Sequence, residues 1–328
     1  MKFYGQLEKS NNYEENNVTI LKAMEQYQNY NIARNLSPHS IEFYKICMEA
    51  FEKFYDCTKL CNTIDENVVF EYITHLKNKN TLNDTSINTN IRALRAMCYY
   101  FMKLGYTAPF QISMLRTEKK IKETYTDEEL AILLKKPTIS KTTFAEYRNW
   151  VIVNYLLATG NRVGTICDLK IKDVDFGAGA IRLSRTKNRN EQIIPISKTL
   201  HDVLKGYMKY RKGDGDDYLF CNVNGIRLSE NGLKLAIRKY NLKRGVNKTS
   251  LHLFRHTFAK KWILNGGDVF RLQKMLGHSS MTIVREYVNM FSDDLKRDFD
   301  TFNPLEEFSN KRDEGIKLNP KKIRRMML

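Results

Sequence analysis

Residues 251–259 read LHLFRHTFA, a short run in which apolar positions alternate with two histidines and an arginine. The apolar spacing predicts a helix over residues 251–265, and His252 and Arg255, three positions apart, then share one face. A guanidinium beside an imidazole is suited to binding a phosphate group. His256 completes an HxxxH spacing, but no glutamate follows His252 as a metalloprotease would require. We therefore predict no metal site here.

Further motifs with the same chemical character lie on both sides of this run. They are TGNR at residues 159–162, TKNRN at 186–190, LGH at 276–278 and Tyr287. Each has an ordinary structural explanation when taken alone, because an isolated tyrosine is usually a core residue and an isolated lysine in a hairpin is usually solvated. Only their joint occurrence, in this order, indicates a function.

The segments that surround these motifs predict a mainly α domain with one small antiparallel sheet. The capping box Thr126-x-x-Glu129 opens the domain, and a helix ends near Ala158. Alternating apolar residues predict strands near residues 174–176, 181–183 and 192–196, and periodic runs predict helices near 199–211, 229–242, 251–265, 268–276 and 281–290.

The beginning of the chain predicts a separate bundle of four short helices. Ser37 and Pro38 form a typical helix start, and apolar side chains at helical spacing follow from Ile41 to Tyr55. Similar runs cover residues 68–76 and 87–104, with a weaker one near Ile20.

Residues 108–123 contain Pro109, lose the periodicity and include Lys119, Lys120 and Lys122, a composition typical of a linker that lies on a polyanion. We therefore expect four parts: 1–107, 108–123, 124–300 and 301–328.

The net charge of +17 is distributed unevenly along the chain. Residues 1–106 carry 12 basic and 12 acidic side chains, so the whole excess lies in residues 107–328. A basic domain next to a neutral one favours nucleic acid as the partner, although composition alone is equally compatible with a soluble basic surface.

The six cysteines show no zinc-binding or disulfide spacing, so we expect reduced, mostly buried thiols and a cytoplasmic protein. No run of the sequence reaches the length of a membrane span, and the first residues do not have the pattern of a secretory leader. Membrane association is not expected.

Taken together, these motifs resemble the tyrosine recombinase family, also called the phage integrase family. LSPHSI at residues 36–41 with Tyr44 is similar to the start of the helical, SAM-like core-binding domain of that family. LFRHTFA at 253–259, LGHSS at 276–280 and the nine-residue step from His278 to Tyr287 resemble its catalytic domain. The Xer-like, simple-site members are the most similar, because the chain lacks room for an additional arm-binding domain.

The resemblance implies cleavage and rejoining of DNA strands through a covalent 3′-phosphotyrosine. Tyr287 would be the nucleophile, and Arg162, Arg255 and His278 would stabilise the charge on the phosphate. His252 would accept the proton of Tyr287, whose phenol has an unperturbed pKa near 10, and Lys187 would protonate the leaving 5′-hydroxyl. No cofactor is implied. Arg189, Lys119, Lys120 and Lys122 are further candidates for contacts with DNA.

One position departs from the family pattern. Thr165 stands three residues after Arg162, where the family often has an acidic residue. The carboxylate that would support Arg162 must then come from elsewhere, and Asp168 is a candidate.

The resemblance also implies partners: double-stranded DNA with inverted-repeat core sites, a tetramer on two such sites, and in some systems an accessory protein or a partner recombinase. Residues 301–328 would pass to a neighbouring protomer as a short helix, or they would lie on DNA as a basic tail. The divergent segment at 159–165 and that tail favour a mobile-element integrase or transposase.

Three alternatives are compatible with the same residues. The first is Xer-type resolution of chromosome or plasmid dimers. The second is a type IB topoisomerase, which the family-like first domain disfavours. The third is a non-catalytic DNA-binding accessory protein, which the complete set of candidate residues disfavours.

Overall fold

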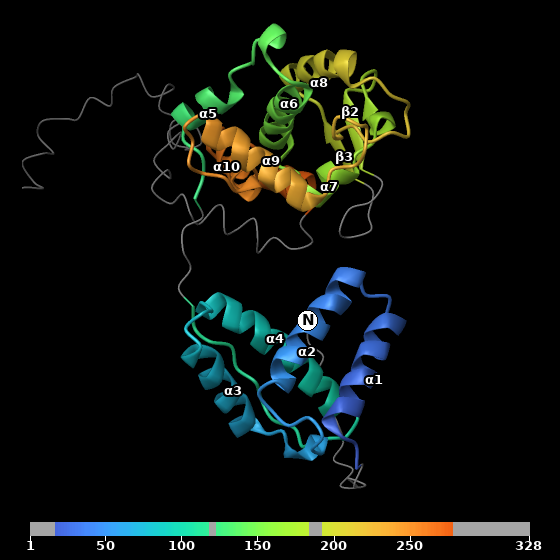
Figure 1. Ribbon diagram of the computed structural model, residues 1–328, viewed down its shortest axis with the longest axis vertical. Helices are drawn as coiled ribbons and strands as arrows, with labels where there is room; N and C mark the ends of the chain where they lie inside the picture. Colours follow the sequence, from blue (N-terminus) through green and yellow to red (C-terminus); the bar gives the residue numbers. More distant parts are fainter. Residues whose placement is uncertain (1–16, 118–122, 184–191, 278–328) are drawn as a thin grey trace, which may run out of the picture. The chain divides into compact units, whose positions relative to one another are not determined.

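The computed structural model describes residues 17–117, 123–183 and 192–277. The chain separates into two compact units, with the division at Lys120 (Figure 1). Each unit has its own hydrophobic core. None of the helices in the described ranges has the length and apolar character that a membrane span needs.

The first unit is a bundle of four α-helices, as the periodicity predicts. They are α1 (Ile20–Ala33), α2 (Pro38–Glu52), α3 (Glu66–Asn78) and α4 (Asp84–Lys103). The side chain of Ser37 caps α2 and Pro38 occupies its first turn, which confirms the predicted start. Fully buried aromatic residues such as Phe51, Tyr72 and Phe101 form the centre of the core.

The second unit is mainly helical with one small sheet, which confirms the predicted fold class. Its helices are α5 (Asp127–Leu134), α6 (Phe144–Thr159), α7 (Val163–Asp168), α8 (Lys198–Arg211), α9 (Glu230–Lys243), α10 (Leu251–Leu264) and α11 (Val269–Leu276). The strands β1 (Val174–Asp175), β2 (Ala180–Leu183) and β3 (Gln192–Pro195) pair antiparallel in the order β1-β2-β3. The predicted capping box of Thr126 and Glu129 is present at the start of α5.

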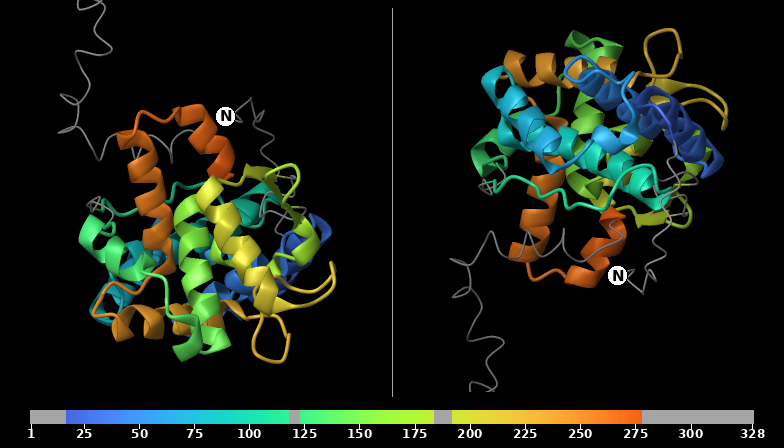
Figure 2. Two further views of the ribbon diagram at one scale, coloured as in Figure 1. Left: turned by 90° about the horizontal axis from the view of Figure 1, so that it is seen from above. Right: turned by 90° about the horizontal axis from the view of Figure 1, so that it is seen from below.

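Helix α6 forms the centre of the second unit. Seen from above in Figure 2, it lies between α8 and α10, and both helices pack against it. Its residues Val151, Ile152 and Val153 are consecutive and fully buried, as expected for a helix covered on all sides. The buried Arg148 is satisfied by Asn149 and by the carbonyl of Cys221. This rigid helix therefore fixes the position of the turn that follows it.

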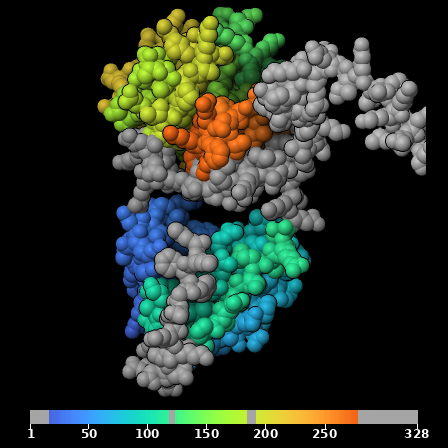
Figure 3. Space-filling model, turned by 180° about the vertical axis from the view of Figure 1, so that it is seen from behind, coloured from blue at the N-terminus to red at the C-terminus, as the bar shows by residue number. Residues whose placement is uncertain are grey.

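A smaller apolar cluster joins α10 to α11. It consists of Phe258, Ala259, Leu272 and Leu276, all buried. Residues of these two helices form part of the surface of the second unit (Figure 3, orange). All six cysteines are buried and free, which agrees with the expectation of reduced thiols.

Candidate active site

The turn between α6 and α7 is held against α10 and α11. Gly160 ends α6 with a left-handed backbone, φ 62°. A Cβ atom at this position would lie 2.5 Å from Cδ1 of Phe258 and 2.8 Å from Cδ2 of Leu276. Only glycine accommodates both the backbone angle and the close approach of these side chains. The glycine of the TGNR motif is thereby explained by geometry.

Asn161 and Thr159 hold the same turn from the inside. The buried Asn161 donates from Nδ2 to the hydroxyl of Tyr155 at 2.7 Å, and the hydroxyl of Thr159 donates to the carbonyl of Tyr155 at 2.8 Å. Arg162 then follows as the N-cap of α7, with a partly buried side chain. The backbone that carries Arg162 is therefore fixed by hydrogen bonds on one side and by packing on the other.

Arg255 connects the turn to the end of α11. This arginine is 5% exposed, and it donates from Nη1 to the carbonyl of Gly160 and from Nη2 to that of Leu276, both at 2.8 Å. The carbonyl end of a helix carries partial negative charge, which stabilises a guanidinium placed there. Arg255 thus joins α6, α10 and α11 at one point.

Arg162 reaches the same point from the other side. Gly277 ends α11 with a left-handed backbone, φ 60°, and a Cβ atom on Gly277 would lie 3.6 Å from Nη1 of Arg162. Gly277 directly precedes His278 in the sequence. The two arginines predicted from separate motifs are therefore brought together at the end of α11.

His252 lies one turn before Arg255 on α10, as the spacing predicts. Partial burial lowers the pKa of its imidazole, and the nearby charges of Arg255, Lys234 and Arg162 lower it further, whereas Glu230 opposes them. A lowered pKa keeps the imidazole neutral near pH 7, which is the form that accepts a proton.

Gln192 is a structural neighbour of the site that the motifs did not indicate. From the first position of β3, its Nε2 donates to the carbonyls of Lys274 at 2.8 Å and Met275 at 2.5 Å. Its Oε1 would lie 3.2 Å from a Cβ atom on Gly277. Gln192 and Arg255 together bind the last three carbonyls of α11, of which that of Lys274 also accepts from the backbone N–H of Gly277. Only its position shortly after the basic segment at residues 186–190 could have indicated this role.

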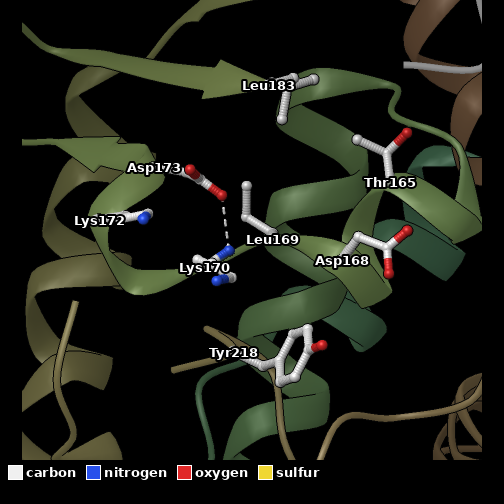
Figure 4. A pocket seen from close by; sticks show the side chains of 8 residues that line it. All are labelled: Thr165, Asp168, Leu169, Lys170, Lys172, Asp173, Leu183 and Tyr218. Carbon is white, nitrogen blue, oxygen red and sulfur yellow. Dashed lines mark hydrogen bonds between the residues drawn. The ribbon is translucent and has the colours of Figure 1, made fainter. Parts of the chain in front are cut away.

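Thr165 and Asp168 lie on α7 and line a hollow beside the sheet (Figure 4). Oδ1 of Asp168 accepts hydrogen bonds from Nε and Nη2 of Arg227, at 2.8 and 2.5 Å. Asp168 is therefore the partner of Arg227, and the hypothesis that it supports Arg162 is wrong. Because Asp168 ends α7 whereas Arg162 precedes its first residue, the two side chains are separated by the length of the helix.

The other charges of this hollow are also paired. Lys170 and Lys172 both form ion pairs with Asp216, at 3.0 and 2.6 Å. The backbone N–H of Lys170 donates to Asp173, as the dashed line in Figure 4 marks. These contacts are structural: they hold the start of β1 to the loop that follows α8.

Several candidate residues lie outside the described ranges. They are Lys187, His278 and Tyr287, the DNA-contact candidates Lys119, Lys120, Lys122 and Arg189, the helix expected at 281–290 and residues 301–328. In the described part of the chain, no group of three histidine, cysteine, aspartate or glutamate side chains is placed to hold a metal ion.

A helical unit with a small antiparallel sheet that brings two arginines together at one helix end, with a histidine one turn from the second arginine, is suited to binding a phosphodiester. The chain belongs to the phage integrase family, which it matches over residues 123–293. Residues 24–104 match the N-terminal SAM-like domain of phage integrases. The protein is a tyrosine recombinase of the Xer and integrase type, an enzyme of site-specific DNA recombination.

Individual relatives cover most of the chain. It is 28% identical over 293 residues to the tyrosine recombinase XerD of Staphylococcus epidermidis, a match that covers 86% of this chain and 98% of XerD. The tyrosine recombinase XerC of Staphylococcus aureus is 27% identical over 288 residues, covering 85% of this chain and 95% of XerC.

Solved structures show the same fold. The Tn1549 transposon integrase in complex with a circular intermediate DNA has a TM-score of 0.66 at 21% identity, covering 81% of this chain and 94% of that one. The XerH recombinase bound to its palindromic difH substrate has a TM-score of 0.65 at 21% identity, covering 83% and 82% of the two chains.

Proposed function

We propose that this recombinase cleaves DNA through a covalent 3′-phosphotyrosine at Tyr287. The observation that carries the proposal is the convergence of Arg162 and Arg255, from two distant segments of the sequence, at the end of α11, with His252 one turn before Arg255 on α10. His278 follows this end directly in the sequence, and Tyr287 lies nine residues further on.

The chemistry follows from the charges. Attack on a phosphodiester places negative charge on the nonbridging oxygens, and Arg162, Arg255 and His278 would stabilise it. His252, kept neutral by its lowered pKa, would accept the proton of Tyr287. Lys187 would protonate the 5′-hydroxyl that leaves. The bond to Tyr287 conserves the energy of the phosphodiester, so a second strand can be joined without a cofactor.

A suicide substrate tests this chemistry. Wild type and Tyr287→Phe are incubated with a nicked duplex taken from the ends of the encoding element or replicon. We expect an SDS-stable protein–DNA adduct with wild type and none with Tyr287→Phe. Binding that footprinting confirms, without any adduct, would contradict the proposal and favour a non-catalytic accessory protein.

We propose double-stranded DNA with inverted-repeat core sites as the substrate, bound by both units and by the linker that contains Lys119, Lys120 and Lys122. Arg189 in the basic segment 186–190 is a further candidate contact. The excess positive charge after residue 106 supports this assignment. Binding dominated by phosphates weakens by roughly 10³-fold or more between 50 and 200 mM salt, so a flat response would contradict it.

We propose integration or excision of a mobile element as the biological role, with a tetramer as the active assembly. The divergent segment at 159–165 and the basic tail after Lys311 support the element. Resolution of replicon dimers is the second candidate, because the curated relatives are named XerD and XerC. Recombination of the element's ends in cells, compared with recombination of a chromosomal dimer site, separates the two roles.

We further propose that residues 124–300 form the catalytic domain and residues 1–107 the core-binding domain. Residues 301–328 would dock on a neighbouring protomer as a short helix, with Phe302, Leu305 and Phe308 as anchors. Deletion of residues 301–328 is then expected to leave single-site binding intact and to abolish the slower-migrating complexes on a two-site DNA.

A further inference from the structure

A second basic hollow, separate from the convergence of the arginines, opens between α9 and the start of α10. Its volume is about 260 Å³, and its polar lining consists of Lys234, Arg238, Thr249, Ser250 and His252. His252 is thus shared between this hollow and the candidate active site. An anion in the hollow would lie beside His252, which also belongs to the candidate active site.

The two cations of this hollow form no ion pair in the described part of the chain, although Glu230, the one acidic residue of α9, stands four residues before Lys234. Lys234 and Arg238 are one turn apart on α9, an arrangement in which like charges destabilise a helix. Among the residues that the structure describes, neither of them forms an ion pair. Glu230, one turn before Lys234, lies instead against α7, where its Oε1 would be 2.9 Å from a Cβ atom on Gly164.

Cations at the end of α9 and on α10 do form ion pairs, in contrast to Lys234 and Arg238. Lys243 and Arg244 pair with Glu146 at 3.2 and 3.5 Å, and on α10 Lys261 pairs with Asp127. These three cations therefore have an ion-pair partner, whereas Lys234 and Arg238 beside His252 have none in the described part of the chain. Two neighbouring cations without an ion-pair partner attract an anion.

The hydroxyls of the hollow indicate which anion. Ser250 begins α10 without a hydrogen bond from its side chain to the helix, so its hydroxyl is available as a donor, and Thr249 precedes it. Ammonium, guanidinium and hydroxyl donors match the oxygens of a phosphate, and the two positive charges favour an anionic phosphate over an uncharged base edge. The neighbouring phosphate of a bound DNA strand meets this requirement.

We propose that this hollow binds a second backbone phosphate of the cleaved strand, directly next to the scissile phosphate, with Lys234 and Arg238 as its ligands. The proposal rests on the proposed function, because it takes the phosphate at Arg162, His252 and Arg255 to be the scissile one. The second contact fixes the strand on both sides of the reacting bond, which is how binding energy positions a substrate.

Three positions on α9 provide the test: Lys234→Gln, Arg238→Gln and the control Lys239→Gln. Lys239 is adjacent to Arg238 in sequence but lines a different hollow, between α6 and α9. We expect Lys234→Gln and Arg238→Gln each to weaken DNA binding by about tenfold and to reduce the slope of log affinity against log salt by about 1. Lys239→Gln is expected to change the affinity by less than about twofold.

A modified substrate then identifies the contact. A neutral methylphosphonate is placed at either phosphate adjacent to the cleavage position. At one of these two positions, we expect the modification to weaken the binding of wild type, to weaken Lys234→Gln or Arg238→Gln by less, and to add nothing to the double variant that carries both substitutions. The Lys239→Gln control is expected to lose affinity as wild type does.

The outcomes separate the two proposals. An SDS-stable adduct with wild type, together with fully additive losses at both adjacent phosphates, would overturn the second phosphate site and leave the proposed function standing. A loss of affinity in Lys239→Gln as large as that in Lys234→Gln would likewise overturn the second phosphate site and leave the proposed function standing. Failure of wild type to form the adduct on a confirmed site would overturn both proposals.

Discussion

Gly160 meets two requirements, a left-handed backbone and a close approach of neighbouring side chains, and each adds its own cost to the free energy of a substitution. The left-handed backbone alone costs a residue with a Cβ atom about 1 kcal/mol, and the 2.5 Å approach of Phe258 adds overpacking of about 2 kcal/mol. We expect Gly160→Ala to lower the free energy of unfolding by about 3 kcal/mol, measured by urea denaturation. Gly179 has a similar φ of 60°, but a Cβ atom added there would meet no atom within 4 Å, so Gly179→Ala should lose only about 1 kcal/mol. Equal losses in the two variants would contradict the packing argument.

The ionisation of His252 determines how adduct formation depends on pH. Because the pKa of the imidazole is lowered, the acid limb should have its midpoint below the ordinary value of about 6.5. As pH falls through that pKa, the imidazole binds a proton and can no longer accept one from Tyr287. Glu230 favours the protonated form, so Glu230→Gln should move the midpoint to lower pH, whereas Glu25→Gln in the first unit should not. The single-turnover rate of adduct formation, measured against pH, gives the midpoint for wild type and for each variant. A wild-type midpoint above about 6.5 would contradict the role of His252.

The end of α11 depends on side chains from other elements. Gln192 and Arg255 together satisfy the carbonyls of Lys274, Met275 and Leu276. We expect Gln192→Ala to lose about 1–2 kcal/mol of stability and to slow adduct formation by roughly tenfold, with DNA affinity unchanged, because the carbonyl of Met275 loses its side-chain donor and that of Lys274 keeps only Gly277. Gln192→Glu should be slower still near neutral pH, since a carboxylate would face two carbonyls. Full activity of Gln192→Glu would show that the donor is not needed.

The sequence pattern predicts helices and strands whose formation depends on neighbouring residues. It does not predict contacts between elements that are distant in the sequence. The capping box at Thr126, the helix that carries His252 and Arg255 and the three strands follow from periodicity and caps, which neighbouring residues determine. The partners of Asp168 and Gln192 lie 59 and more than 80 residues away. Polar side chains carry no periodic pattern that would indicate such partners. For this reason the sequence suggests Arg162, a near neighbour, as the partner of Asp168, whereas Arg227 is its partner in space.

At the scale of the molecule, the charge and the cores are divided in the same way. The first unit is built around one closed apolar core, and the second around another with α6 at its centre. The positive excess belongs to the part that contains the candidate active site. We therefore expect residues after 106, which include the linker and the second unit, to supply most of the electrostatic share of DNA affinity.

Two separate cores also predict two separable unfolding events. Phe101 and Leu156 are fully buried, the first in the core of the first unit and the second in that of the second unit. Removal of such a side chain costs about 2–5 kcal/mol, which is a large part of the stability of one domain. In calorimetry or hydrogen exchange of the full chain, Phe101→Ala should lower only the transition of the first unit, and Leu156→Ala only that of the second. If each substitution lowered both transitions equally, the two cores would be one cooperative unit, and the division into a core-binding and a catalytic domain would lose its thermodynamic basis.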